Sequence, residues 1–337
     1  MEKIQDIFLG IPSICAQWQE FLLSKGLRPP SNLDTIDKTV GIYDEANGDI
    51  LGCGSIKDNV IQLVAVSDKD GQNSARFNAI ITELSNRLAA AGRYHIFVFT
   101  KPEYSQSFQY LGFHELVQTE FAALLEKGKP NINDFLSNIP KPVGKQIASI
   151  VMNANPFTLG HRALVEAAAA ENDQVVVFVV ASDGSLFKPG ERLELVRQGL
   201  SDLSTVSVSS GADYMVSFAT FPSYFIKDQA EITAYQTALD AQLFKKWIIP
   251  PLGITSRYLG EEPFSEATEI YNQSLKRELS DIIEVKIIPR KKADQEIISA
   301  TAVRQAIKEN NMSKIKSFVP ATTYEFIKKN LNEIQTR

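Results

Sequence analysis

Hydrophobic positions in the first third of the chain are grouped in short runs that are typical of strands. These runs cover residues 39–43, 49–56, 60–66 and 94–100. The turn residues Glu45-Ala46-Asn47-Gly48 join the first two runs as a hairpin. A helix-period segment over residues 74–91 separates the third run from the fourth. The pattern therefore predicts the order β-β-β-α-β, followed by a short helix that ends at Gly112 and leads into another strand.

The second half of the chain shows a different pattern, in which apolar runs alternate with helix-period segments. The runs lie at residues 147–152, 175–181, 204–209, 254–259 and 282–288. Such alternation is typical of a parallel sheet covered by helices on both faces. Between the two patterns, residues 128–145 interleave prolines with glycines and lysines, which indicates a linker. We therefore expect an α+β domain over residues 1–135, a linker over 136–146 and a doubly wound α/β domain over 147–337.

The composition agrees with two domains of a soluble globular protein. The chain has 337 residues, of which 44% are hydrophobic and 22% charged. No apolar run approaches the roughly 18 residues of a membrane span, and the start MEKIQDIF lacks the regions of a signal peptide. We therefore expect a cytoplasmic protein with no membrane partner. The net charge of −5 argues against nucleic-acid binding, although the basic run Arg290-Lys291-Lys292 can meet a phosphate-bearing ligand.

The two cysteines, Cys15 and Cys53, have neither metal-ligand spacing nor the pattern of a disulfide framework. We interpret both as reduced packing residues. A covalent cysteine intermediate is therefore disfavoured, and no protein metal site is expected.

A polar turn between the strand at 147–152 and the next predicted helix carries the sequence Asn155-Pro156-Phe157-Thr158-Leu159-Gly160-His161. Ligands of open α/β sheets bind beyond the carboxyl ends of the strands, where a helix start presents unpaired amides to phosphate. Gly160 lets the backbone approach closely, and His161 can donate a hydrogen bond to an α-phosphate oxygen. Thr158 can donate a hydrogen bond but cannot carry charge. The alternative is that His161 is a capping or core residue.

A second polar motif opens a predicted helix near the end of the chain, with Ser299, Thr301 and Arg304 in its first turns. Hydroxyls and amides at a helix start can hold β- and γ-phosphates, and Arg304 can supply a charged fork to departing pyrophosphate. On its own this motif is often only a capped surface helix. Its occurrence with the first motif in one α/β domain indicates an ATP site.

The two motifs, T-L-G-H and I-S-A-T-A-V-R, resemble the H-x-G-H and I-S-x-T-x-x-R signatures of the nucleotidyltransferase superfamily, with Thr158 in place of the first histidine. The resemblance implies that the domain binds ATP. It also implies Mg²⁺ on the triphosphate, and since no pair of acidic residues has ligand spacing, we expect the metal to be held mainly by phosphates and water.

Further candidates take their roles from that resemblance. The superfamily recognises adenosine at the sheet edge that here follows the fourth strand of the domain, which makes Arg257, Gly260 and Glu261 candidates. Lys188 in a loop, with Arg192 and Arg197 on the following helix, can face the triphosphate, although a solvated amphipathic helix is the alternative. The aromatic segment with Tyr214, Phe218, Phe221, Tyr224 and Phe225 can wall an acyl pocket or pack under the sheet.

The first half, ending in Q-S-F-Q-Y-L-G-F, is similar to the GNAT-type N-acetyltransferase fold over residues 38–125. In that family a glycine-bearing loop holds the pyrophosphate of coenzyme A, whereas residues 71–77 here place Ser74 or Ala75 at the glycine positions. We therefore expect a docking or packing role, or a role in holding a pantetheine-bearing arm, in place of acetyl-coenzyme A chemistry.

Nearly the whole chain resembles the citrate lyase ligase family. The resemblance rests on five segments in this order, at residues 152–166, 187–203, 210–229, 252–263 and 287–304. It implies a ligase that uses ATP and acetate to acetylate the phosphoribosyl-dephospho-coenzyme A thiol on the acyl carrier subunit of citrate lyase, through acetyl-AMP and with release of AMP and pyrophosphate. The alternatives are a nucleotidyltransferase of another small substrate, an acetyl-coenzyme A-dependent acetyltransferase and a non-catalytic carrier-binding protein.

Overall fold

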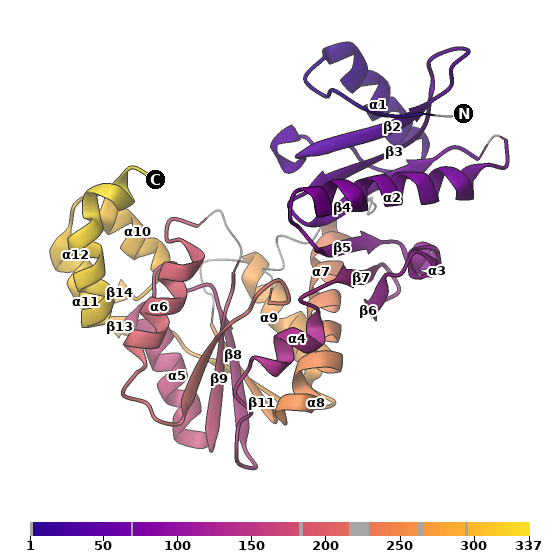
Figure 1. Ribbon diagram of the computed structural model, residues 1–337. Helices are drawn as coiled ribbons and strands as arrows, with labels where there is room; N and C mark the ends of the chain where they lie inside the picture. The colour runs from indigo at the N-terminus through magenta and orange to yellow at the C-terminus, as the bar shows by residue number, and fades with distance from the viewer. Residues whose placement is uncertain (1–2, 69, 182–184, 216–228, 262–265, 294–295) are drawn as a thin grey trace. The chain divides into compact units, whose positions relative to one another are not determined.

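The computed structural model describes residues 3–68, 70–181, 185–215, 229–261, 266–293 and 296–337. The chain divides into two compact units (Figure 1). Unit 1 comprises Met1–Asp134 and Phe221–Leu239, and unit 2 comprises Phe135–Thr220 and Asp240–Arg337. Within the described residues, no helix is both long and apolar enough to cross a membrane.

Unit 1 is built on a mixed sheet of seven strands in the order β1-β2-β3-β4-β5-β7-β6. Its elements are β1 (Ile4–Asp6), α1 (Pro12–Ser24), β2 (Lys38–Tyr43), β3 (Ile50–Lys57), β4 (Val60–Val66), α2 (Asn73–Ala90), β5 (His95–Thr100), α3 (Ser105–Tyr110), β6 (His114–Gln118) and β7 (Ala123–Gly128). Strands β4 and β5 are parallel, and the other described pairs are antiparallel. The predicted order β-β-β-α-β is confirmed.

Helix α2 packs closely on one face of this sheet because two glycines of β3 leave room for it. The helix buries Ile80, Leu84 and other apolar residues at helical spacing. A β-carbon at Gly54 would lie 2.8 Å from carbon atoms of both Ile80 and Leu84. Substitution of this glycine would therefore force the side chains of Ile80 and Leu84 to shift.

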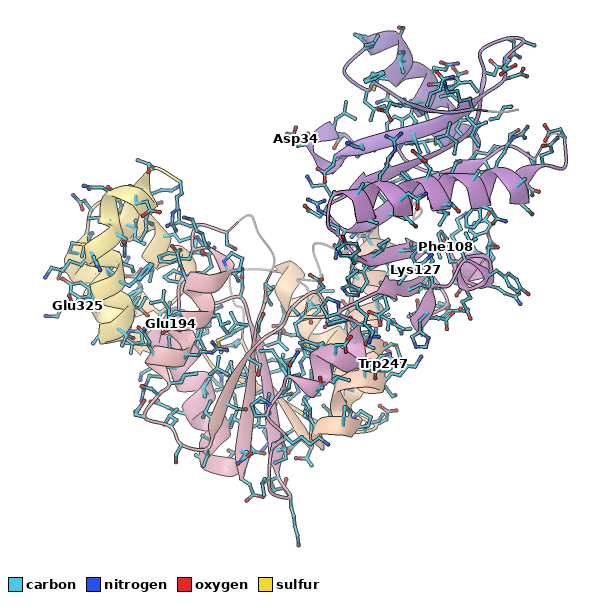
Figure 2. All side chains as sticks on the ribbon, in the orientation of Figure 1. Asp34, Phe108, Lys127, Glu194, Trp247 and Glu325 are labelled. Carbon is cyan, nitrogen blue, oxygen red and sulfur yellow. The ribbon has the colours of Figure 1, made fainter. Side chains whose placement is uncertain are left out.

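A cavity of about 270 Å³ opens in unit 1 where β4 and β5 diverge. The two strands pair through Val60 with Phe97 and through Ile61 with Val98, and the cavity is lined by the residues that follow on each strand. Leu63 has a φ of 54°, which is unusual for a bulky residue and marks a local bend in β4. Phe108 of α3, labelled in Figure 2, forms part of the wall.

Unit 2 contains a five-stranded parallel sheet in the order β10-β9-β8-β11-β12. The strands are β8 (Ile147–Met152), β9 (Gln174–Val179), β10 (Val206–Ser210), β11 (Ser256–Gly260) and β12 (Glu284–Ile288), and a small antiparallel pair is formed by β13 (Lys292–Ala293) and β14 (Glu296–Ile297). The helices of unit 2 are α5 (Leu159–Glu171), α6 (Pro189–Gly199), α8 (Ile249–Leu252), α9 (Glu266–Leu279), α10 (Ala300–Lys308), α11 (Met312–Phe318) and α12 (Ala321–Gln335), with a π-helical turn at Phe244–Ile248. Two further helices, α4 (Ile132–Ser137) and α7 (Gln229–Leu243), contribute residues to both units. The predicted doubly wound α/β fold is confirmed.

The order of the strands reverses beside β8, and this reversal positions the site. From β8 the chain runs outward to β9 and β10, and it returns to β11 on the other side. Figure 1 shows α5 and α6 on one side of the sheet and α8 on the other. Ligands of such folds bind beyond the carboxyl ends of the strands at this reversal. The crevice beyond β8 and β11 is therefore the expected site.

Three helices at the end of the chain, α10, α11 and α12, pack together, and α12 also packs on α6. Their apolar positions include Val303, Ile315 and Ile327, which join the core of unit 2. Figure 2 labels Glu194 on α6 and Glu325 on α12. This packing attaches the start of α10, with its polar motif, to the helices that cover β8 and β9.

Candidate active site

The start of α5 is held by reciprocal hydrogen bonds between Thr158 and His161. The Thr158 hydroxyl accepts from the backbone N–H of His161 at 3.3 Å, and the backbone N–H of Thr158 donates to Nδ1 of His161 at 3.1 Å. This is a capping arrangement at the N-cap and N3 positions. The local sequence therefore fixes the direction of the His161 ring.

These hydrogen bonds determine which nitrogen of His161 carries the proton. Because Nδ1 accepts from a backbone N–H, the proton of the neutral ring lies on Nε2. The Thr158 hydroxyl lies 2.9 Å from the same Nδ1, and Thr158 is 1% exposed. In the structure Thr158 orients His161, and its hydroxyl is engaged with that ring.

His161 is held in its neutral form. Burial and, to a smaller extent, the positive charge of Arg290 together lower its pKa to about 4. The ring stacks on Phe157 with centroids 5.9 Å apart. At neutral pH, His161 therefore presents a fixed, uncharged Nε2–H donor.

Two glycines allow close packing around this turn. Phe157 is fully buried, and a β-carbon at Gly199 would lie 2.5 Å from its ring. A β-carbon at Gly160 would lie 3.2 Å from the carbonyl oxygen of Ile298. The helix start that carries His161 thus lies directly against the segment that leads into α10.

The structure joins the two motifs that the sequence analysis singled out. Arg304 donates from Nη1 to the carbonyl oxygen of Asn155 at 2.7 Å and from Nη2 to the Thr301 hydroxyl at 2.9 Å. Ser299 is the N-cap of α10 and accepts from the backbone N–H of Ala302 at 3.1 Å. Partial burial lowers the pKa of Arg304, which nonetheless stays charged at neutral pH. Arg304 therefore brings a cation to the turn that contains cis Pro156.

The loop before α6 meets the same turn. The side-chain oxygen of Asn155 accepts from the backbone N–H of Phe187 at 3.0 Å. Lys188 follows as the N-cap of α6, is exposed, and lies 3.4 Å from Glu333. Asn155 and Lys188 thus lie on adjoining segments, while the Lys188 side chain pairs with α12.

Arg192 was expected to face the triphosphate, but in the structure its side chain is bound within the protein. It is fully buried and donates to the carbonyl oxygens of Phe187, Asn153 and Val180 at 2.7–3.1 Å. These carbonyls come from the ends of β8 and β9 and from the loop before α6. Arg192 therefore ties the carboxyl edge of the sheet together, and its charge is committed to backbone oxygens.

Arg257 is likewise removed from the expected adenosine site. It lies near the start of β11 and is 1% exposed, whereas Gly260 and Glu261 lie at the carboxyl end of the same strand. Its guanidinium lies 4.2 Å from the ring centre of Phe244 and 3.8 Å from Asp240. Gly260 and Glu261 lie at the carboxyl edge of the sheet, where the ligand is expected, and Arg257 belongs to the core.

Arg290, which follows β12, was visible in the sequence only as part of a basic run. Arg290 donates from Nε to the carbonyl oxygen of Glu261 at 2.7 Å and from Nη1 to that of Ile298 at 3.2 Å. Sequence spacing carries no signal for this position, because the two carbonyls come from separate segments of the chain.

The aromatic segment is described only in part, and the structure shows the surroundings of Cys53. Tyr214 is buried with its ring 5.0 Å from that of Phe135, while Phe218, Phe221, Tyr224 and Phe225 lie outside the described residues. Burial raises the pKa of the Cys53 thiol to about 12, so this cysteine stays protonated. Among the described residues, no group of three or more His, Cys, Asp or Glu side chains is placed to hold a metal ion.

Comparison with known proteins identifies the family. The model of the citrate lyase ligase C-terminal domain matches residues 147–327. The citrate (pro-3S)-lyase ligase of Haemophilus influenzae is 38% identical over 320 residues, which cover 92% of this chain and 94% of that protein. The corresponding ligase of Escherichia coli is 35% identical over 305 residues, covering 87% and 86%. A phosphopantetheine adenylyltransferase of Corynebacterium efficiens is 36% identical over 69 residues, covering 20% of this chain and 43% of that protein. The chain therefore belongs to the citrate lyase ligase family and is an enzyme of the ligase class.

Proposed function

We propose that this enzyme activates citrate lyase by acetylating the phosphoribosyl-dephospho-coenzyme A thiol of the acyl carrier subunit, using ATP and acetate. The observation that carries the proposal is the hydrogen bond from Arg304 to the carbonyl oxygen of Asn155. It brings a guanidinium and the start of α10 to the turn that presents the Nε2–H of His161. Such a set of donors suits the α-phosphate and the pyrophosphate of one ATP molecule.

In the first step, an acetate oxygen attacks the α-phosphorus of ATP and forms acetyl-AMP. The bond from the α-phosphorus to the bridging oxygen breaks, and pyrophosphate leaves with the bonding electron pair. His161 donates from Nε2 to an α-phosphate oxygen as charge builds there. Arg304, Ser299, Thr301 and the amides at the start of α10 hold the departing pyrophosphate. The match to an adenylyltransferase supports adenylyl transfer in this step.

In the second step, the carrier thiolate attacks the carbonyl carbon of acetyl-AMP. The thioester bond forms, and the bond from the carbonyl carbon to the AMP oxygen breaks, so AMP leaves as the phosphate anion. Both steps proceed without an acyl-enzyme, in agreement with the protonated, buried Cys53. Mg²⁺ would be held mainly by the phosphates and water and would neutralise part of the phosphate charge.

The overall reaction is tested by incubating the enzyme with ATP, acetate and deacetylated citrate lyase. We expect AMP and pyrophosphate in equal amounts, one acetyl group per carrier, and recovery of lyase activity. Replacing acetate and ATP by acetyl-coenzyme A should give no recovery. Recovery with acetyl-coenzyme A alone, or formation of ADP in place of AMP, would contradict the proposal.

We also propose that residues 1–135 and 147–337 act as separate functional domains joined by residues 136–146, with the first domain holding the pantetheine arm of the carrier. The cavity between β4 and β5 supports this role. Diverging strands leave peptide groups that can pair with the amides of an extended chain, and the wall includes the apolar residues Val64, Val98 and Phe108. A pantetheine arm has both features, since it is extended and carries two amides.

The start of α2 disfavours free coenzyme A as the occupant. Asp70 accepts from the backbone N–H of Gln72 at 3.2 Å and from Arg76 at 2.5–2.7 Å. The hydrogen bond from Arg76 lowers the pKa of Asp70, so a carboxylate stands where a pyrophosphate loop would be expected. The ion pair between Asp70 and Arg76 occupies the loop and neutralises the positive charge that could attract a pyrophosphate. The arm of the carrier can enter the cavity without placing a pyrophosphate there.

Val64→Phe, which fills part of the cavity, should separate the two steps. We expect acetate-dependent ATP–pyrophosphate exchange to stay near the wild-type rate and acetylation of the carrier to fall about tenfold, which equals ~1.4 kcal/mol. The matched control is Val60→Phe, on the same strand but away from the cavity wall. Full carrier acetylation by the folded Val64→Phe enzyme would remove the cavity from the thiol step.

A further inference from the structure

We propose that Arg290 is an additional phosphate-binding cation of the nucleotide site, outside both sequence motifs, and that it holds ATP beside His161. The inference rests on the proposed ATP-dependent function and adds a binding residue to it. It starts from the position of Arg290 in the fold. Arg290 follows the end of β12, and the backbone N–H of Glu261 donates to the carbonyl oxygen of Ile288 at 2.9 Å. The residue therefore lies at the carboxyl edge of the sheet, next to the end of β11.

The guanidinium of Arg290 is fixed by carbonyl groups from two other segments. Nε donates to Glu261 at the end of β11, and Nη1 donates to Ile298 just before α10. Two such bonds hold the guanidinium plane in one orientation. Arg290 thus connects the end of the sheet with the start of the helix that carries Ser299, Thr301 and Arg304.

One carbonyl oxygen relates Arg290 to the first motif. The oxygen of Ile298 that accepts from Arg290 is the same atom that a β-carbon at Gly160 would approach to 3.2 Å. Arg290 is therefore a close neighbour of the start of α5. The positive charge also acts on His161, whose pKa it lowers.

The electrostatic setting favours an anion at this place. The start of α5 carries the positive end of its helix dipole, His161 is neutral, and Arg290 adds a full positive charge. Burial lowers the pKa of Arg290, while the nearby Glu261 raises it, and the guanidinium remains charged. A phosphate group would complete this arrangement, because it can accept from the helix amides, from Nε2 of His161 and from a guanidinium.

The structure distinguishes Arg290 from its basic neighbours. The side chains of Lys291 and Lys292 are exposed. Lys291 contributes its backbone carbonyl to Ile298, and Lys292 begins β13. Of the basic run Arg290-Lys291-Lys292, the described contacts direct the side chain of Arg290 to the carboxyl edge of the sheet.

The test measures ATP binding directly by calorimetry, together with acetate-dependent ATP–pyrophosphate exchange. Arg290→Ala should weaken ATP binding about 10- to 100-fold, the range for losing hydrogen bonds to a charged group. The KM for ATP should rise while the KM for acetate stays near the wild-type value. Arg290→Lys should restore part of the ATP affinity, because it keeps the charge but lacks the planar fork. Lys292→Ala is the matched control and should bind ATP as the wild type does.

Three outcomes would overturn the proposal. The first is wild-type ATP affinity in folded Arg290→Ala enzyme. The second is an equal loss of ATP affinity in Lys292→Ala, which would indicate a diffuse effect of surface charge. The third is a lowered thermal midpoint of Arg290→Ala with unchanged KM for ATP, which would assign Arg290 a purely structural role. ATP binding is measured without acetate or carrier. Failure of the acetylation reaction alone would therefore contradict the proposed function but not the role of Arg290 in ATP binding.

Discussion

His161→Ala should slow acetate-dependent ATP–pyrophosphate exchange by about 10²- to 10³-fold, which is the usual effect of removing one preorganised donor to a developing oxyanion. The structure strengthens the reason, because the ring is fixed by the backbone N–H of Thr158 and its Nε2–H faces away from that bond. Since the donor acts on charge that develops in the transition state, kcat should fall more than the affinity for ATP.

His114→Ala is the matched control, since His114 is an exposed histidine on β6 of unit 1. We expect this variant to exchange pyrophosphate at the wild-type rate. Exchange by His161→Ala within about threefold of the wild type would remove His161 from the proposed chemistry, provided that the variant shows the wild-type thermal midpoint.

The protonation state of His161 gives the same prediction a spectroscopic check. The chain has three histidines, so ¹⁵N resonances can be assigned with single variants. A pKa of about 4 keeps the ring neutral from pH 8 down to about 5, and Nε2 should carry the proton throughout. Because folding lowers this pKa, the neutral ring favours the folded state above pH ~6.5, and that contribution is lost as the pH falls towards 4. An imidazolium signal at pH 7 would contradict the assignment.

Arg257→Ala should destabilise the protein by about 3–5 kcal/mol, the cost of removing one partner of a buried ion pair. Asp240 and Arg257 are 4% and 1% exposed, and the hydroxyl of Tyr271 donates to Asp240 at 2.5 Å. Without the guanidinium, the Asp240 carboxyl would be buried with no opposite charge beside it among the described contacts. The measurement is the urea midpoint of unfolding, compared with Arg277→Ala, which removes an arginine with a 72% exposed side chain.

The effect of Arg257→Ala should depend on pH in a defined direction. Burial already raises the pKa of Asp240, and loss of the Arg257 charge would raise it further. An acid with a raised pKa in the folded state loses stability as the pH rises through that pKa, so the variant should be less stable at pH 8 than at pH 5. The double variant Arg257→Met with Asp240→Asn removes both charges and should recover most of the lost stability.

Two results would contradict this account of Arg257. A wild-type urea midpoint for Arg257→Ala would show that the buried pair contributes nothing. Loss of ATP affinity at unchanged stability would return Arg257 to the adenosine site that the sequence suggested. Nε and Nη1 of Arg257 have no hydrogen-bond partner in the described structure. This limits how much the Arg257–Asp240 ion pair can stabilise the folded state.

Local sequence was sufficient for the elements and for the start of α5. The runs at 147–152 and 174–179 are almost wholly apolar because helices cover both faces of a parallel sheet, and this gives an unmistakable pattern. For His161 the sequence left a capping role open as the alternative, and the structure shows that Thr158 and His161 hydrogen-bond to each other at the N-cap and N3 positions. Local spacing predicts the strands, the helices and the helix caps, because each depends on residues within one or two turns of each other.

Only the tertiary structure decided what each arginine does. The sequence placed Arg304 in a motif, whereas Arg192, Arg257 and Arg290 could be read from it only as cations near predicted site segments. Arg192 and Arg257 are buried against carbonyls, an aromatic ring and a carboxylate, while Arg290 and Arg304 are partly buried and donate to carbonyl oxygens next to the two motifs. The groups that surround each guanidinium come from distant parts of the chain, as in the bond from Arg304 to Asn155. Whether a guanidinium can bind a ligand depends on the groups that surround and desolvate it. Those groups come together only when separate segments of the chain pack.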